Sequence, residues 1–120
     1  MSSSGSPLDM GDLVWVEFDD PAFGHEQAGR RPALVLSDRS YNALSSFVLV
    51  CPVTRRSRNW AFQVPIKASR TSGDAIVDQI KSVDRRRIVS LAFDRVDEGT
   101  LASVREVLGA ILSLELPAGA

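Results

Sequence analysis

Histidine and cysteine are nearly absent from this 120-residue sequence, which contains one residue of each. Two histidines therefore cannot supply the acid and the base of catalysis within one chain. The same scarcity leaves no ordinary zinc site and no support for a Ser/His/Asp or Cys/His arrangement. Phosphate loops of the GxxxxGK[ST] and GxGxxG forms are also missing. If the protein is an enzyme, we expect it to use no metal ion and no cofactor.

A long apolar run is missing as well. No stretch approaches the roughly 20 residues that span a bilayer, and residues 1–6 contain neither a basic region nor an apolar segment. Cys51 lies inside an apolar run and has no partner for an internal disulfide, so we expect a buried thiol in a reducing compartment. These features favour a cytoplasmic protein that does not associate with membranes.

The length suits one domain. Residues 1–9 are rich in serine and show no periodicity, so we expect a disordered tail there and a single domain over residues 10–116. The net charge is −1, but nearly all of the positive charge is arginine and is concentrated in three groups. They are Arg30-Arg31, Arg55-Arg56-Ser57-Arg58 and Arg85-Arg86-Arg87. A near-neutral total can conceal a positive face that suits nucleic acid.

Short β-rich runs bounded by turn residues dominate the chain. Expected strands cover residues 13–18, 32–37, 46–54, 60–66, 75–83 and 87–89, with Trp60 in the core, and a long polar loop covers residues 21–30. Apolar side chains at helical spacing predict one helix over residues 97–116, begun by Asp97 or Thr100 and ended by Pro117. The pattern is typical of a mainly β fold with a C-terminal helix, either a partly open barrel or two packed sheets.

Arg31 is the first candidate for chemistry. It precedes Pro32 at the start of an expected strand, and a fixed guanidinium can hold a phosphate through paired donors. RNA carries its own nucleophile, the 2′-hydroxyl beside the scissile phosphate. A protein that cuts RNA therefore has to supply only a base, an acid and charge stabilisation.

Four blocks, in order, resemble the signatures of MazF/PemK-type toxins. They are residues 11–16 (Gly-Asp-Leu-Val-Trp-Val), residues 26–37 (Glu-Gln-Ala-Gly-Arg-Arg-Pro-Ala-Leu-Val-Leu-Ser), residues 51–54 (Cys-Pro-Val-Thr) and residues 78–83 (Asp-Gln-Ile-Lys-Ser-Val). The resemblance extends over about residues 10–114. It implies an SH3-like, partly open β-barrel of the MazF/PemK/CcdB kind and a homodimer.

The resemblance also implies an activity. Such toxins cleave single-stranded RNA at short sequences without a metal ion, through a 2′,3′-cyclic phosphate, and thereby arrest growth. It implies as partner a cognate MazE-like antitoxin, whose acidic, flexible tail occupies the RNA groove and is removed under stress.

Carried over by position, the catalytic pair of the family falls on Arg31 and Thr54. Arg31 would neutralise the charge of the transition state and is a candidate proton donor, and Thr54 would hydrogen-bond a phosphate oxygen. Glu26 matches a loop acid that acts as a base or reads RNA. The further candidates for RNA contact are Phe23, His25, Gln27, Arg55, Arg56, Arg58 and Gln79. His25 stands where many relatives have a small residue, and an imidazole there can stack on a base or assist proton transfer.

Two other functions remain open at this stage. A related barrel is used by toxins that bind DNA gyrase and cut no RNA, and a degenerate member of the family would serve only as a scaffold for a partner. The presence of both Arg31 and Thr54 favours the ribonuclease.

Overall fold

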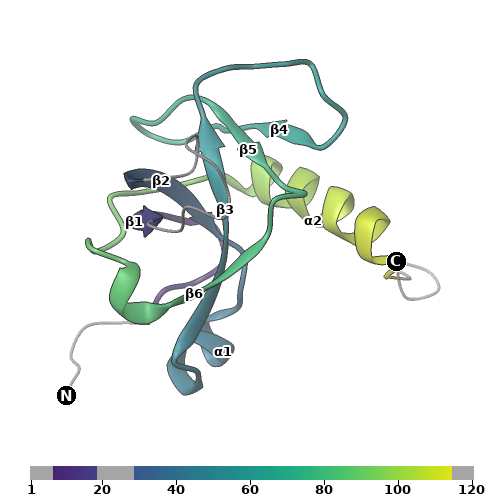
Figure 1. Cartoon of the computed structure of the whole chain (residues 1–120). Coiled ribbons are helices and arrows are strands. Elements are labelled where there is room, and N and C mark those ends of the chain that lie inside the picture. Colours follow the sequence, from purple (N-terminus) through teal and green to yellow (C-terminus); the bar gives the residue numbers. More distant parts are fainter. Residues whose placement is uncertain (1–6, 19–28, 115–120) are drawn as a thin grey trace.

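The described part of the chain consists of short strands and two helices (Figure 1). The computed structural model describes residues 7–18 and 29–114. Its elements are β1 (Asp12–Phe18), β2 (Gly29–Val35), α1 (Arg39–Leu44), β3 (Phe47–Thr54), β4 (Gln63–Pro65), β5 (Asp74–Ile76), β6 (Lys81–Asp84), the 3-10 turn η3 (Arg85–Arg87), β7 (Asp94–Arg95) and α2 (Glu98–Leu112).

The strands form one antiparallel sheet in the order β4-β5-β3-β2-β1-β7, and β6 also pairs with β3. An isolated bridge between Val16 and Ile88 connects the segment after β6 to β1. Strands β1, β2, β3 and β6 therefore close into a small barrel, while β4, β5 and β7 extend the sheet beyond it. The mainly β, partly open architecture with a C-terminal helix is confirmed.

Alternation along the central strands separates two hydrophobic clusters. One gathers the even-numbered residues of β1 and β3 with odd-numbered residues of β2, including Val16, Val35 and Val50. The other lies on the opposite face and includes Leu34 and Cys51 together with side chains of α2. Each fully buried Val or Leu contributes roughly 1.5–3 kcal/mol, so these two clusters are the main source of the fold's stability.

Helix α2 begins as the sequence predicts. The Asp97 carboxylate accepts the backbone N–H of Thr100 at 2.8 Å, and this N-cap lowers the pKa of Asp97. Leu101 and Val104 are buried against the sheet. The helix ends at Leu112, earlier than the predicted residue 116, because Ser113 adopts a left-handed conformation. Neither α2 nor any other helix within residues 7–18 and 29–114 has the length and hydropathy to cross a membrane.

Three other predictions of secondary structure are wrong. The expected strand over residues 60–66 is shortened to β4, because Trp60 and Gln63 close a turn through a backbone hydrogen bond of 3.0 Å. The expected strand over residues 75–83 is split into β5 and β6 by a turn in which Gln79 N–H donates to the Ile76 carbonyl. Residues 87–89 form no strand beyond the single bridge at Ile88.

Cys51 is fully buried on β3, as predicted. Burial raises the pKa of its thiol far above the usual value, and the negative charge of Asp78 acts in the same direction. The thiol is therefore protonated and serves as a small apolar side chain.

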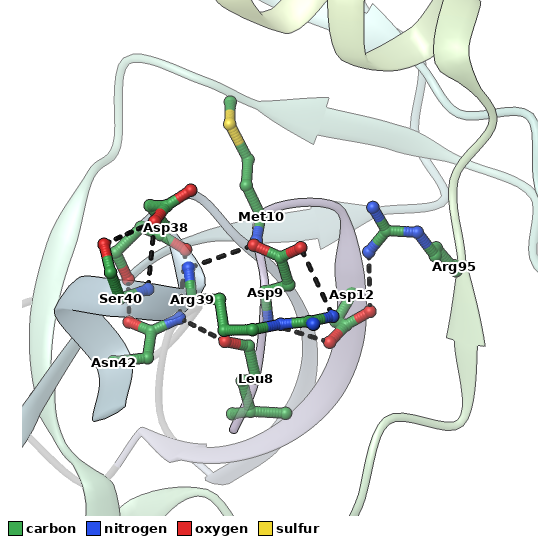
Figure 2. Close-up of polar contacts among 10 residues, drawn as sticks. Leu8, Asp9, Met10, Asp12, Asp38, Arg39, Ser40, Asn42 and Arg95 are labelled. Atoms are coloured by element: carbon green, nitrogen blue, oxygen red, sulfur yellow. Dashed lines mark hydrogen bonds and ion pairs between the residues drawn. The ribbon is translucent and has the colours of Figure 1, made fainter. Parts of the chain in front are cut away.

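Helix α1, which the sequence pattern does not predict, is anchored through the fully buried Asn42. The Asn42 amide donates to the carbonyl oxygens of Leu8 (2.7 Å) and Ser37 (3.0 Å), and its oxygen accepts the Ser37 hydroxyl at 2.5 Å. Figure 2 shows this corner, where Asp9 also accepts the N–H of Arg39. Leu8 and Asp9 are thus tied to the domain, although the expected tail includes them.

We expect Asn42→Ala to lower the free energy of unfolding by about 2–4 kcal/mol, because the carbonyls of Leu8 and Ser37 lose a donor and the buried Ser37 hydroxyl loses its acceptor. Urea denaturation measures the loss. The control Asn59→Gly, at an exposed position with a left-handed φ of 54°, should change stability by no more than about 0.5 kcal/mol. Equal effects of the two substitutions would contradict the anchoring role of Asn42.

Candidate active site

A cavity of about 660 Å³ opens where the ends of β2 and β3 meet the segment that follows β5. Its walls come from β1, β2, β3, the connection between β3 and β4, and the turn after β5. The lining residues are Trp15, Arg31, Pro32, Pro52, Val53, Thr54, Arg55, Arg56, Arg58, Trp60, Gln63, Ile76, Asp78 and Gln79. The cavity therefore contains Arg31, Thr54, Gln79 and the arginines at positions 55, 56 and 58, which the sequence singled out.

The β2–β3 register brings Arg31 and Thr54 to the same end of the sheet. Ala33 pairs with Pro52, so the same register continued by two residues places Arg31 opposite Thr54. Both side chains line the cavity. Two residues distant in sequence thus meet because adjacent antiparallel strands end together.

Arg31 is half-buried and has an unused donor. Its Nε is buried and makes no hydrogen bond within residues 7–18 and 29–114. The neighbouring Arg30 points to the other face of β2 and lies 3.6 Å from the Glu17 carboxylate. An unpaired buried donor is costly, so the Arg31 Nε calls for an acceptor beyond those that the described residues supply.

Thr54 is oriented by the chain that follows it. Its Oγ1 accepts the backbone N–H of Arg56 at 3.1 Å. Because a hydroxyl can donate one hydrogen bond while it accepts another, Thr54 can also donate to a ligand oxygen in the cavity.

The cavity is strongly positive despite the near-neutral chain. Among the residues that the structure describes, four arginines line it against one carboxylate, that of Asp78. No ion pair within the described ranges involves Arg55, Arg56 or Arg58. Such a concentration of unpaired guanidinium groups favours a polyanionic ligand.

Two tryptophans line the cavity, contrary to expectation for one of them. Trp60, predicted as a core residue, is 53% exposed, because it lies in the turn before β4 and not in a strand. Trp15 was not identified from the sequence. Its ring is 37% exposed and stacks on Phe93, with ring centroids 5.5 Å apart. Both indoles offer flat apolar surfaces for bases.

The third arginine group does not line the cavity. The Arg85 guanidinium donates to the carbonyls of Asn42 and Ser45 at the end of α1. Arg86 forms an ion pair of 3.0 Å with Asp84 and lowers the pKa of that carboxyl to about 2. Arg87 donates to the Glu17 carbonyl. These three side chains are engaged in contacts within the fold.

Four of the candidate site residues predicted from the sequence lie outside the part of the chain that the structure describes. They are Phe23, His25, Glu26 and Gln27. Their proposed roles therefore remain predictions. Of the residues that line the cavity, Trp15, Gln63 and Asp78 were not assigned a role from the sequence, although Asp78 directly precedes the Gln79 that was.

The backbone beside Thr54 is held by a second strand and by Asp94. Thr54 pairs with Asp74 of β5, and Gly73 approaches so closely that a Cβ there would lie 2.6 Å from the Thr54 carbonyl oxygen. The segment before Gly73 is fixed because the Asp94 carboxylate accepts the Arg70 N–H (2.8 Å) and the Thr71 hydroxyl (2.7 Å). These hydrogen bonds lower the pKa of Asp94 to about 2.

Comparison with known proteins places residues 9–112 in a family described as PemK-like, MazF-like toxin of type II toxin-antitoxin system. The chain is 47% identical over 75 residues to the endoribonuclease toxin MazF of Escherichia coli K12, covering 62% of this chain and 67% of that protein. It is 37% identical over 113 residues to the endoribonuclease toxin ChpB of the same strain, covering 86% of this chain and 96% of ChpB.

Solved structures agree with this result. The crystal structure of MazF from Deinococcus radiodurans has a TM-score of 0.79 and 39% identity, and covers 92% of this chain and all of that one. A MazE-MazF crystal structure from the same organism has a TM-score of 0.76 and 33% identity, with the same coverage.

Substitution of Gly73 tests how tightly the backbone of Gly73 packs against the backbone of Thr54. Gly73→Ala places a methyl group against the Thr54 carbonyl at a φ of +139°, so we expect a loss of about 2–4 kcal/mol in unfolding free energy. Gly29→Ala is the matched control, because Gly29 also has a positive φ, +86°, but no atom lies within 4 Å of the added Cβ. If urea denaturation gave equal losses, the close approach at Gly73 would be without energetic consequence.

Proposed function

The chain belongs to the family of PemK-like, MazF-like toxins of type II toxin-antitoxin systems, and from that premise we propose that it cuts single-stranded RNA as a sequence-specific endoribonuclease. The observation that carries the proposal is the positive cavity that both Arg31 and Thr54 line, with the buried Nε of Arg31 lacking a hydrogen-bond partner among the described residues. The identified relatives are named as endoribonucleases, and a gyrase-binding function is therefore not favoured.

The reaction requires little covalent chemistry from the protein. The 2′-hydroxyl of the substrate loses its proton and attacks the adjacent phosphorus, the bond to the 5′-oxygen breaks, and a 2′,3′-cyclic phosphate forms. Negative charge grows on the phosphate oxygens in the transition state, so groups that bind this charge accelerate the step.

Arg31 and Thr54 have complementary roles in this proposal. The Arg31 guanidinium donates to the phosphate oxygens, including through the Nε that has no partner within the described part of the chain, and Thr54 donates its hydroxyl hydrogen to one of them. A guanidinium does not give up its proton in a protein. The proton for the departing 5′-oxygen therefore comes from water in the open cavity, and Arg31 acts through charge.

Asp78 is the proposed base. Among the described residues that line the cavity it has the one carboxylate, and proton abstraction from the 2′-hydroxyl needs an acceptor of this kind. Glu26, the base candidate from the family resemblance, lies outside the described residues. Glu26, which the family resemblance implies as a base or a reader of RNA, is therefore kept as the alternative base, and Phe23, His25 and Gln27 are assigned to RNA recognition.

The remaining cavity residues bind the strand on either side of the scissile phosphate. Arg55, Arg56 and Arg58 neutralise neighbouring phosphates, Gln79 contributes a polar contact, and Trp15 and Trp60 stack on unpaired bases. Stacking on aromatic surfaces needs bases that are free of pairing, which accounts for single-stranded RNA as the substrate.

An antitoxin of MazE type is the proposed protein partner, since a relative from D. radiodurans crystallises as a MazE-MazF complex. An acidic, flexible tail would compete with RNA for the same arginines. We also propose a homodimer, to which the exposed Ile111, Leu112 and Leu114 at the end of α2 contribute apolar surface. The proposed site of action is the cytoplasm, where RNA and antitoxin are both present.

The activity is tested with purified protein, a long single-stranded RNA and EDTA. We expect cleavage in the presence of the chelator and 2′,3′-cyclic phosphate ends, with kcat/KM reduced about 100- to 1,000-fold by Arg31→Ala. The matched control is Arg30→Ala, because Arg30 is not among the residues that line the cavity and forms an ion pair with Glu17. It should retain activity within about three-fold. No cleavage by the wild type would refute the proposed function.

Two substitutions distinguish the proposed base from the alternative carboxylate. Asp78→Asn should lower kcat about 100-fold or more, because the amide cannot accept the 2′-hydroxyl proton. Glu26→Gln should mainly raise KM, and Glu106→Gln on the exposed face of α2 should change neither parameter. Single-turnover kinetics with saturating enzyme give the chemical step directly. A larger loss of kcat in Glu26→Gln than in Asp78→Asn would transfer the role of base to Glu26.

A further inference from the structure

The connection between β3 and β4, residues 55–62 and here called the arginine loop, is held by hydrogen bonds at both of its ends. At its start, Thr54 Oγ1 accepts the Arg56 N–H. At its end, the Gln63 side-chain oxygen accepts the Arg58 N–H at 3.0 Å, and the Gln63 N–H donates to the Trp60 carbonyl. Gln63 thus takes part in two hydrogen bonds that close the loop. Its side chain is half-buried and lines the cavity.

The loop needs such an anchor because its own residues do not stabilise it. Arg55, Arg56 and Arg58 are exposed, and none of them makes an ion pair within the described part of the chain. Three like charges within four residues repel one another. Without external acceptors, the loop would sample many conformations.

The chemical identity of the anchor matters as well. A glutamine oxygen accepts a hydrogen bond without carrying a charge. A carboxylate at the same place would accept the same N–H but would cancel part of the positive potential of the cavity. Gln63 therefore orders the arginine loop without reducing the positive potential of the cavity.

We infer that Gln63 is a positioning residue that holds the arginine loop in the conformation in which it binds RNA phosphates. The inference rests on the proposed ribonuclease function for its substrate. Gln63 lowers the entropic cost of binding, since a loop that is already ordered loses less freedom when RNA arrives. Its effect acts on KM, whereas Arg31 and Thr54 act on the chemical step.

Two variants of Gln63 distinguish the effect of the hydrogen bond that orders the arginine loop from the effect of the charge at position 63. Gln63→Met keeps the length and removes the acceptor, and we expect the Arg58 amide hydrogen to exchange about ten-fold faster or more in this variant, measured by NMR on the free protein. Gln63→Glu keeps the acceptor, so the Arg58 amide should exchange within about two-fold of the wild type. This readout needs no RNA and tests the anchor whether or not the proposed function holds.

Kinetics test the consequence for RNA. We expect Gln63→Met to raise KM about ten-fold with kcat within about two-fold of the wild type. Gln63→Glu should also raise KM, but with a lower salt dependence of binding, because a charge has been cancelled. When Arg55, Arg56 and Arg58 are all alanine, Gln63→Met should change KM by less than about two-fold, because the guanidinium groups that it positions are gone.

The exchange and kinetic measurements can each contradict the positioning role of Gln63. Unchanged exchange at Arg58 in Gln63→Met, an equal fall in kcat, or a full effect on KM in the triple-alanine background would overturn the positioning role. A wild-type protein that cuts no RNA would refute the ribonuclease proposal and leave the exchange measurement to decide whether Gln63 anchors the loop.

Discussion

Three strands hydrogen-bond to β3, and the placement of the whole cavity depends on these pairings. The first half of β3 pairs with β6, its last two residues pair with β5, and β2 occupies the other edge. Because both edges are occupied, the end of β3 is fixed in two directions. Thr54 is its last residue, the arginine loop starts immediately after it, and β2 brings Arg31 alongside. A shift of β3 by one residue would turn these side chains toward the opposite face.

Much of the fold could be predicted from local patterns. The first and third strands and the start of α2 follow from β-rich runs, apolar spacing and the capping residue Asp97. The failures have a common physical reason, since the turns at Gln63 and Gln79 are closed by backbone hydrogen bonds to the residues three positions earlier, which the alternation of side chains does not encode. Helix α1 depends on Asn42 and on the distant Leu8 and Arg85, so a six-residue window gives little indication of it.

The candidate site was predictable where chemistry and family resemblance agreed, and less so elsewhere. Arg31, Thr54 and the arginines after β3 were singled out from the sequence, and all of them line the cavity. Trp60 was assigned to the core because an aromatic residue in an alternating run normally packs inside, whereas a turn exposes it. Asp78 and Trp15 gained a candidate role only from the topology, which brings β1 and the turn after β5 to the same opening.

The protonated state of Cys51 has a consequence for the conditions under which the protein works. The thiolate is the nucleophile that attacks peroxides and disulfides, and its formation at Cys51 is suppressed by burial and by the charge of Asp78. The chain has no other cysteine. Glutathionylation, sulfenylation and intermolecular disulfide formation are therefore disfavoured for the folded protein. Its activity should be insensitive to the redox state of the cell, and control is left to the supply of its partners.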